Sequence, residues 1–136
     1  MEPMNLKVEL PNVADIELVA LEGLVRLSRH LGIAEEKIGE AKILVTEAII
    51  NAFEHAGSGT PVRVEFTMTP GEIVILVRDF GRGFEPGAVP DPSIDEKLSA
   101  ERKRGWGLKL MRSMSDDFRI ESDASGTKIT IRKLLT

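Results

Sequence analysis

Apolar and polar positions change their spacing several times along the chain, and each spacing predicts a different element. Residues 6–10, LKVEL, alternate between apolar and polar and are followed by a proline, which predicts a strand with one buried face. Apolar residues then recur at helical intervals over residues 14–32, which end on Gly32, a residue suited to a C-cap. A second helical pattern over residues 34–57 opens with acidic residues and closes on Gly57. The first half of the chain therefore predicts one strand and two helices, the second helix being the longest element.

The second half of the chain predicts two hairpins separated by a loop and a short helix. Residues 62–68 alternate strictly, residues 72–79 are apolar at their centre, and the turn TPGE between them predicts a hairpin whose second strand is central. Regular spacing fails over residues 79–105 and returns as a helical pattern in residues 107–118. Residues 118–133 then form another hairpin.

This order of elements predicts one α+β domain, residues 1–136: a two-layer sandwich in which an antiparallel or mixed sheet carries helices on one face. A length of 136 residues with 42% apolar residues suffices for one hydrophobic core. A net charge of −4 gives no positive field toward nucleic acid or anionic lipid, so we expect direct contact with neither.

Several absences from the sequence limit the kind of protein further. The chain has no cysteine, which excludes disulfides and thiolate zinc sites and agrees with a cytoplasmic protein. Its start does not resemble a secretory signal. The longest apolar run, residues 73–77, is far shorter than the ~20 residues needed to span a bilayer. We therefore expect a cytoplasmic protein without a membrane segment.

The stretch TEAIINAFEHAG in the long helix places Glu47, Asn51, Glu54 and His55 within one narrow sector. Glu47 and Asn51 are spaced i and i+4 in the middle of the helix, so their side chains can converge on a point about 5–6 Å across. A carboxylate and an amide oxygen there could position a hydroxyl group and a Mg²⁺ ion, which prefers hard oxygen ligands. For Glu54 and His55, a solvated helix face and a pocket wall both stay open.

Glycine-rich segments flank the predicted loop. RDFGRGF precedes it with Asp79, Gly81 and Gly83, and KRGWGLKL follows it with Gly105 and Gly107. Closely spaced glycines let the backbone approach a ligand, and amides at a helix start can point at phosphate oxygens. Taken alone, each segment is also typical of a simple turn or helix entry. Taken together, they make a nucleotide the natural candidate ligand.

Three motifs, in this order, resemble the N, G1 and G2 boxes of the histidine-kinase-like (GHKL) ATPase superfamily: Glu47-x-x-x-Asn51, Asp79-x-Gly81-x-Gly83 and Gly105-x-Gly107-Leu108. The resemblance implies the Bergerat-type ATP-binding fold. Within the superfamily, the chain is most similar to the small stand-alone anti-sigma factor serine/threonine kinases. This similarity runs from the first strand to the last and includes the segments LGIAEEKI, EAIINAFEHA and ERKRGWGLKLMRSMSDDF.

The resemblance implies a role for each motif residue. Glu47 would be the general base toward the attacking hydroxyl, Asn51 would ligate a Mg²⁺ ion that bridges the ATP phosphates, and Asp79 would accept the adenine amino group. Residues 84–104 would correspond to the ATP lid. Trp106 departs from the smaller or flexible side chain expected between the G2 glycines. The remaining residues implied in ATP binding are His55, Gly81, Gly83, Arg104, Gly105, Gly107, Leu108 and Thr127.

The resemblance also implies a function in the bacterial cytoplasm. The protein would be an ATP-dependent anti-sigma factor that binds a sigma factor and phosphorylates a serine on a STAS-type anti-sigma factor antagonist, and it would form a homodimer. Two alternatives stay open: a nucleotide-sensing, partner-switching module without kinase activity, and the catalytic ATP-binding domain of a sensor histidine kinase. The presence of Glu47 favours the enzyme, because a pure binding module needs no general base.

Overall fold

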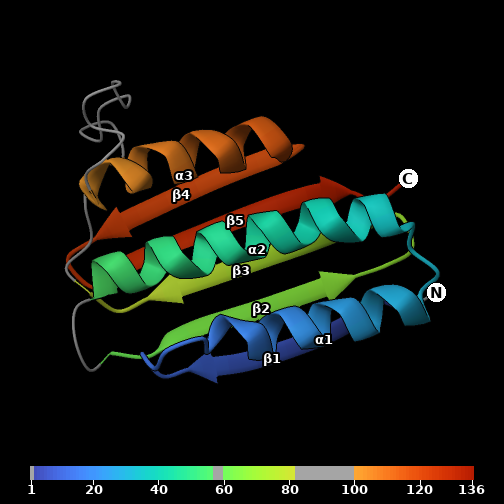
Figure 1. Cartoon of the computed structure of the whole chain (residues 1–136), viewed down its shortest axis with the longest axis horizontal. Helices are drawn as coiled ribbons and strands as arrows, with labels where there is room; N and C mark the ends of the chain where they lie inside the picture. Colours follow the sequence, from blue (N-terminus) through green and yellow to red (C-terminus); the bar gives the residue numbers. More distant parts are fainter. Residues whose placement is uncertain (1, 57–59, 82–99) are drawn as a thin grey trace.

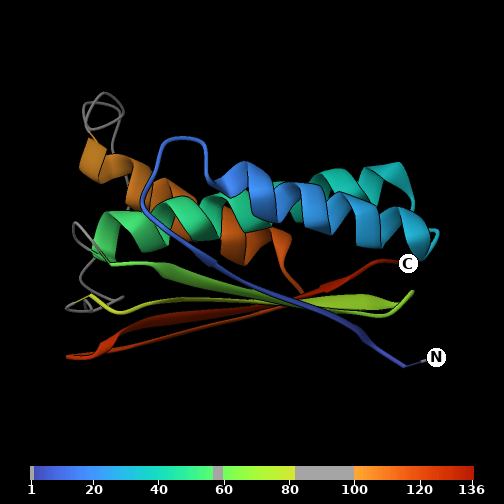
Figure 2. The same cartoon turned by 90° about the horizontal axis from the view of Figure 1, so that it is seen from below.

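The fold is a two-layer α+β sandwich, which confirms the predicted class (Figures 1 and 2). The computed structural model describes residues 2–56, 60–81 and 100–136, without the side chains of residues 100–106. In chain order, the elements of these described residues are β1 (Met4–Leu10), α1 (Glu17–His30), α2 (Glu35–Ala56), β2 (Val62–Met68), β3 (Glu72–Asp79), α3 (Ala100–Met114), β4 (Asp117–Asp123) and β5 (Gly126–Leu134).

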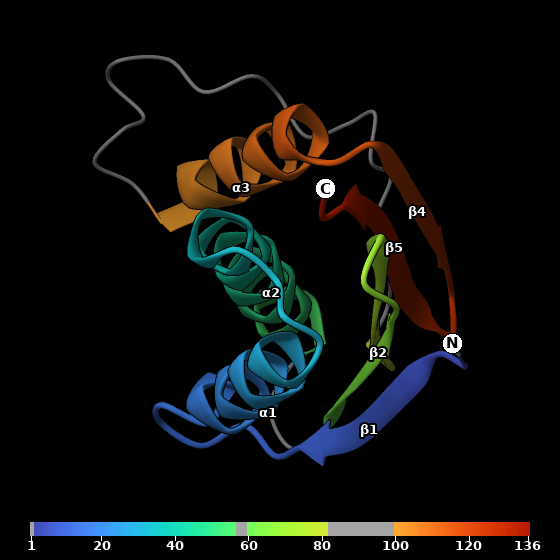
Figure 3. The same cartoon turned by 90° about the vertical axis from the view of Figure 1, so that its right-hand side faces the viewer.

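The five strands form one sheet in the order β1-β2-β3-β5-β4, and each neighbouring pair is antiparallel. The sheet is therefore antiparallel rather than mixed, and β3 is its central strand, as its apolar sequence predicted. The three helices lie on one face of the sheet, with α2 between α1 and α3 (Figures 2 and 3). The pairing of β3 with β5 places Asp79 opposite Thr127.

The core forms between the sheet and the inner face of α2. Alternate residues of β2 are fully buried there, which is the pattern expected of a strand with one covered face. After α1, Gly32 adopts φ +73, and its amide and that of Ile33 donate to the carbonyls of Arg29 and Ser28. These two bonds make a Schellman motif, so Gly32 ends the helix as predicted. No helix within the described ranges is long and apolar enough to cross a membrane.

The start of α3 differs from the prediction. The spacing of apolar residues predicts a helix only from residue 107, whereas α3 begins at Ala100. Residues 100–104, AERKR, are all strong helix formers, so intrinsic propensity extends the helix where no apolar period marks it. Gly105, Gly107 and Leu108 therefore lie inside α3 rather than at its start, and their role in phosphate binding stays a prediction. Of the predicted lid, residues 84–99 lie outside the described residues.

Candidate functional site

Asn51 is a buried polar residue on the face of α2 that the sequence singled out. Only 3% of its surface is exposed, and its Oδ1 and Nδ2 atoms have no hydrogen-bond partner among the described residues. Leaving a buried polar group unsatisfied costs roughly 1–3 kcal/mol, so a buried amide of this kind requires an explanation such as an ion or ligand. Its carboxamide oxygen suits a hard cation.

Glu47 lies one turn before Asn51 on the same side of α2 and is partly buried. Its carboxylate lies against α3, because a Cβ atom added to Gly107 would be 3.0 Å from Glu47 Oε2. The missing side chain at Gly107 thus lets α3 approach this carboxylate. The structure brings the N-box and G2-box residues together, as a shared site requires.

Asp79 is a buried carboxylate at the end of β3, with 1% of its surface exposed. Its Oδ1 accepts hydrogen bonds from the amides of Gly81, at 3.0 Å, and Thr127, at 3.3 Å. Burial raises the pKa of Asp79 above its ordinary value, and the two amide donors oppose this effect. Both bonds use Oδ1, which leaves Oδ2 for a donor on a ligand. The predicted role of Asp79 as a buried acceptor is therefore geometrically possible.

Two glycines allow the backbone around Asp79 to pack closely. A Cβ atom on Gly81 would overlap the carbonyl oxygen of His55, at the end of α2. Gly126 adopts φ +135, and a Cβ atom there would overlap the carbonyl of Asp79. Such contacts require glycine, because any side chain would displace the neighbouring backbone. The ends of β3 and α2 and the start of β5 therefore meet at one point.

The other predicted residues lie in different environments. Thr127 is buried, and its Oγ1 lies 2.9 Å from Ser122 Oγ, a contact that sequence reasoning missed because it depends on the β4–β5 register. Of the two residues for which the sequence left a solvated face and a pocket wall open, Glu54 is exposed and His55 is half-buried. The side chain of Leu108 belongs to the hydrophobic core. Gly83 lies outside the described residues, and for the helical positions Arg104 and Gly105 only the backbone is described.

The described residues hold no cluster of three or more His, Cys, Asp or Glu side chains suited to a metal. Asn51 offers a buried carboxamide oxygen that has no partner among the described residues. A Mg²⁺ ion fits such a site, because it usually keeps several waters and binds through one or two protein oxygens together with substrate phosphates.

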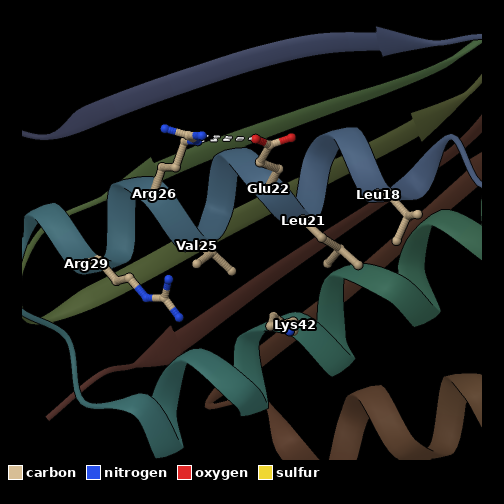
Figure 4. Close-up of a pocket in the computed structure, with 7 residues that line it drawn as sticks. All are labelled: Leu18, Leu21, Glu22, Val25, Arg26, Arg29 and Lys42. Atoms are coloured by element: carbon tan, nitrogen blue, oxygen red, sulfur yellow. Dashed lines mark hydrogen bonds and ion pairs between the residues drawn. The ribbon is translucent and has the colours of Figure 1, made fainter.

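Among the described residues, the helical side of the molecule carries a larger and a smaller surface groove. The larger, with a volume of about 760 Å³, runs between α1 and α2. Figure 4 shows Leu21 and Val25 on its α1 wall and the Arg26–Glu22 ion pair at its rim. The smaller groove, about 360 Å³, follows α2 and reaches Glu47. Sequence reasoning predicted neither groove, and the larger contains none of the predicted site residues.

Comparison with known proteins places the whole chain beside one family. The family model described as histidine kinase-like ATPase domain matches residues 11–133. The serine-protein kinase RsbW of Listeria monocytogenes serotype 4a is 27% identical over 144 residues, which cover 99% of this chain and 91% of that protein. The anti-sigma F factor of Clostridium acetobutylicum is 32% identical over 102 residues, which cover 72% of this chain and 71% of that protein.

Two solved structures share the fold. The RsbU and RsbW domains of Rv1364c from Mycobacterium tuberculosis match with a TM-score of 0.69 and 19% identity over 96% of this chain. The match covers 32% of that chain, so the present sequence spans about a third of its length. The histidine kinase domain of the blue-light activated kinase EL346 from Erythrobacter litoralis matches with a TM-score of 0.51 and 22% identity, over 74% of this chain and 45% of that one.

Proposed function

From the finding that the chain belongs to the histidine kinase-like ATPase domain family, we propose that it is an ATP-dependent anti-sigma factor with protein serine kinase activity. In this proposal, a homodimer in the cytoplasm binds a sigma factor and phosphorylates a serine on a STAS-type antagonist. The names of the two relatives, serine-protein kinase and anti-sigma F factor, support it. The observation that carries it is the buried, unsatisfied carboxamide of Asn51, one helical turn from Glu47.

Asn51 would hold the metal. Its Oδ1 offers a hard oxygen ligand without placing a further negative charge beside a triphosphate. When bound, Mg²⁺ neutralises charge on the ATP phosphates and orients them for in-line transfer. Because the carboxamide is buried, bulk water would compete little with the metal for its oxygen.

Glu47 would orient the acceptor serine and take its proton. As the serine oxygen forms a bond to the γ-phosphorus, the bond from that phosphorus to the bridging oxygen of ADP breaks and the hydroxyl proton passes to the carboxylate. The absent side chain of Gly107 leaves room for the Glu47 carboxylate, because a Cβ atom there would lie 3.0 Å from Oε2. Holding reactants in position supplies much of the rate enhancement in such reactions.

Asp79 would select adenine. Its Oδ1 is engaged by two backbone amides, so Oδ2 can accept from the adenine amino group. Guanine carries a carbonyl at the corresponding position, and a carboxylate facing a carbonyl leaves two acceptors without a donor. The protein is therefore expected to bind ATP far more tightly than GTP.

The kinase proposal can be tested with γ-labelled ATP and the antagonist purified from the same organism. Wild-type protein should label the antagonist on serine, and Glu47→Gln should lose about a hundredfold or more of the rate while still binding ATP. Equal, negligible transfer by both proteins, with intact ATP binding, would instead support the partner-switching module without kinase activity. Label recovered on a histidine would support the sensor-kinase alternative. Light scattering tests the homodimer.

A further inference from the structure

Gly39 occupies a position in α2 that packing does not explain. Glycine inside a helix is destabilising relative to alanine. In α1, Gly23 has a steric reason, because a Cβ atom there would overlap Leu6. A Cβ atom on Gly39, by contrast, would meet no heavy atom within 4 Å. The space beside Gly39 is therefore open in the structure that we describe.

That space belongs to the smaller groove, which we call the Gly39 groove and define by Gly39, Lys42, Ile43, Thr46 and Glu47. These residues recur at intervals of three and four, so they form one stripe along α2. Ile43 is 44% exposed, which gives the groove an apolar floor. The stripe ends at Glu47, whose carboxylate would take the proton from the acceptor serine in the proposed function.

Lys42 gives the groove a positive rim. It lines both the Gly39 groove and the larger groove between α1 and α2 (Figure 4). The neighbouring lysine of α2, Lys37, pairs with Glu40 at 3.4 Å, whereas none of the ion pairs between described residues includes Lys42. An acidic side chain of a partner is the complementary group for such a lysine.

The spacing along α2 matches that of an extended peptide. Ile43 lies one helical turn before Glu47, and Gly39 lies two turns before Glu47. At ~1.5 Å per residue, these separations are about 6 and 12 Å. In an extended segment, every second side chain points to the same face, about 6.6 Å further along at ~3.3 Å per residue. A serine above Glu47 would thus place the side chains two and four residues away above Ile43 and Gly39.

We propose that the Gly39 groove binds the segment of the protein substrate around its acceptor serine. The segment would be extended, with apolar side chains two and four residues from the serine and an acidic side chain that pairs with Lys42. The absent side chain of Gly39 makes room for the more distant apolar group. This inference rests on the proposed kinase function and names the binding site for its acceptor.

Gly39→Ala and Gly39→Leu provide a graded test with the antagonist as substrate. Both replace glycine with a good helix former, so both should raise the melting temperature by roughly 2–4 °C. The leucine fills the groove and should raise KM for the antagonist about tenfold or more, with a smaller rise for alanine. The Kd for ATP, measured without the antagonist, should stay within about twofold, because this glycine lies more than three helical turns, or about 18 Å, from Asn51, the nearest predicted nucleotide residue on α2. Should the leucine disturb α2, the alanine variant still decides the question.

Lys42→Glu tests the charge at the rim, with Lys7→Glu on the opposite face of the sheet as the matched control. Lys42→Glu should raise KM for the antagonist several-fold, and Lys7→Glu should leave it unchanged. If wild-type protein phosphorylates the antagonist but neither glycine variant nor Lys42→Glu changes KM, the groove inference is wrong and the kinase proposal stands. An equal rise for both lysine variants also overturns the acidic contact in the groove. If wild-type protein transfers no phosphate, both proposals fall.

Discussion

Replacing Asp79 with asparagine should separate nucleotide binding from folding, because the two side chains have nearly the same shape. Asp79 Oδ1 accepts from the amides of Gly81 and Thr127, and the carbonyl oxygen of asparagine can accept the same two bonds. The asparagine NH₂ group then stands where Oδ2 was. In the proposed complex, it would face the adenine amino group, which is also a donor.

The expected loss of ATP affinity follows from these groups. A hydrogen bond to a charged acceptor contributes roughly 1.5–3 kcal/mol, and a buried donor left unpaired costs roughly 1–3 kcal/mol. Since these terms overlap, we expect Asp79→Asn to weaken ATP binding by about 2–4 kcal/mol, or about 30- to 1,000-fold in Kd. The Kd for GTP should differ less between wild-type protein and Asp79→Asn than the Kd for ATP does. Isothermal titration with Mg²⁺ present measures both effects.

The same substitution should leave the fold intact or make it more stable at neutral pH. Burial raises the pKa of Asp79 in the folded state, so the folded protein holds this proton more tightly than the unfolded chain does. Stability therefore falls as pH rises from the unfolded to the folded pKa of Asp79, and the penalty is complete above the latter. Asparagine removes this penalty. Urea unfolding of both proteins across this pH range measures the difference.

Two results would contradict the reasoning for Asp79. ATP affinity within about threefold of wild type would show that this carboxylate does not accept from adenine. A clear loss of stability at neutral pH would show that the negative charge itself, rather than the retained oxygen, holds Gly81 and Thr127. Acidification should also weaken ATP binding to wild-type protein at a pH above the ordinary pKa of an aspartate, and Asp79→Asn should lose this dependence.

Three further substitutions test other parts of the site and its support. Asn51→Leu should raise the free energy of unfolding by about 1–3 kcal/mol, because it removes unsatisfied polar atoms, and urea denaturation measures this change. ATP binding to this variant should lose its Mg²⁺ dependence, which titrations with and without Mg²⁺ measure. Gly81→Ala should destabilise the protein by roughly 1–3 kcal/mol through overlap with the His55 carbonyl, as thermal melts would show. Lys133→Met should lower the midpoint of urea unfolding, because Lys133 Nζ donates to the carbonyl oxygen of Met114, at the end of α3, and pairs with Glu40 Oε2 at 3.1 Å. The difference between the two midpoints should shrink as pH falls through the lowered pKa of Glu40, because protonation of Glu40 removes the ion pair.

The elements and contacts that depend only on neighbouring residues could be predicted from the sequence alone. The period of two predicted β1 and β2, the apolar run of residues 73–77 predicted β3, and the helical period predicted α1 and α2. The spacing of Glu47 and Asn51 placed both on one side of α2 without reference to the rest of the fold. The glycine at residue 32 likewise fixed the end of α1, through its φ of +73.

Contacts between segments that are far apart in the sequence became visible only in the folded protein. Asp79 and Thr127 are 48 positions apart in sequence, and the β3–β5 register brings them into hydrogen-bond contact. The approach of Gly107 to Glu47 depends on how α3 packs, and the burial that leaves the Asn51 carboxamide unsatisfied depends on everything packed around α2. The periodicity of a sequence predicts which face of a single helix or strand is buried. Contacts and burial are properties of several elements packed together, so no local pattern in this chain could specify them.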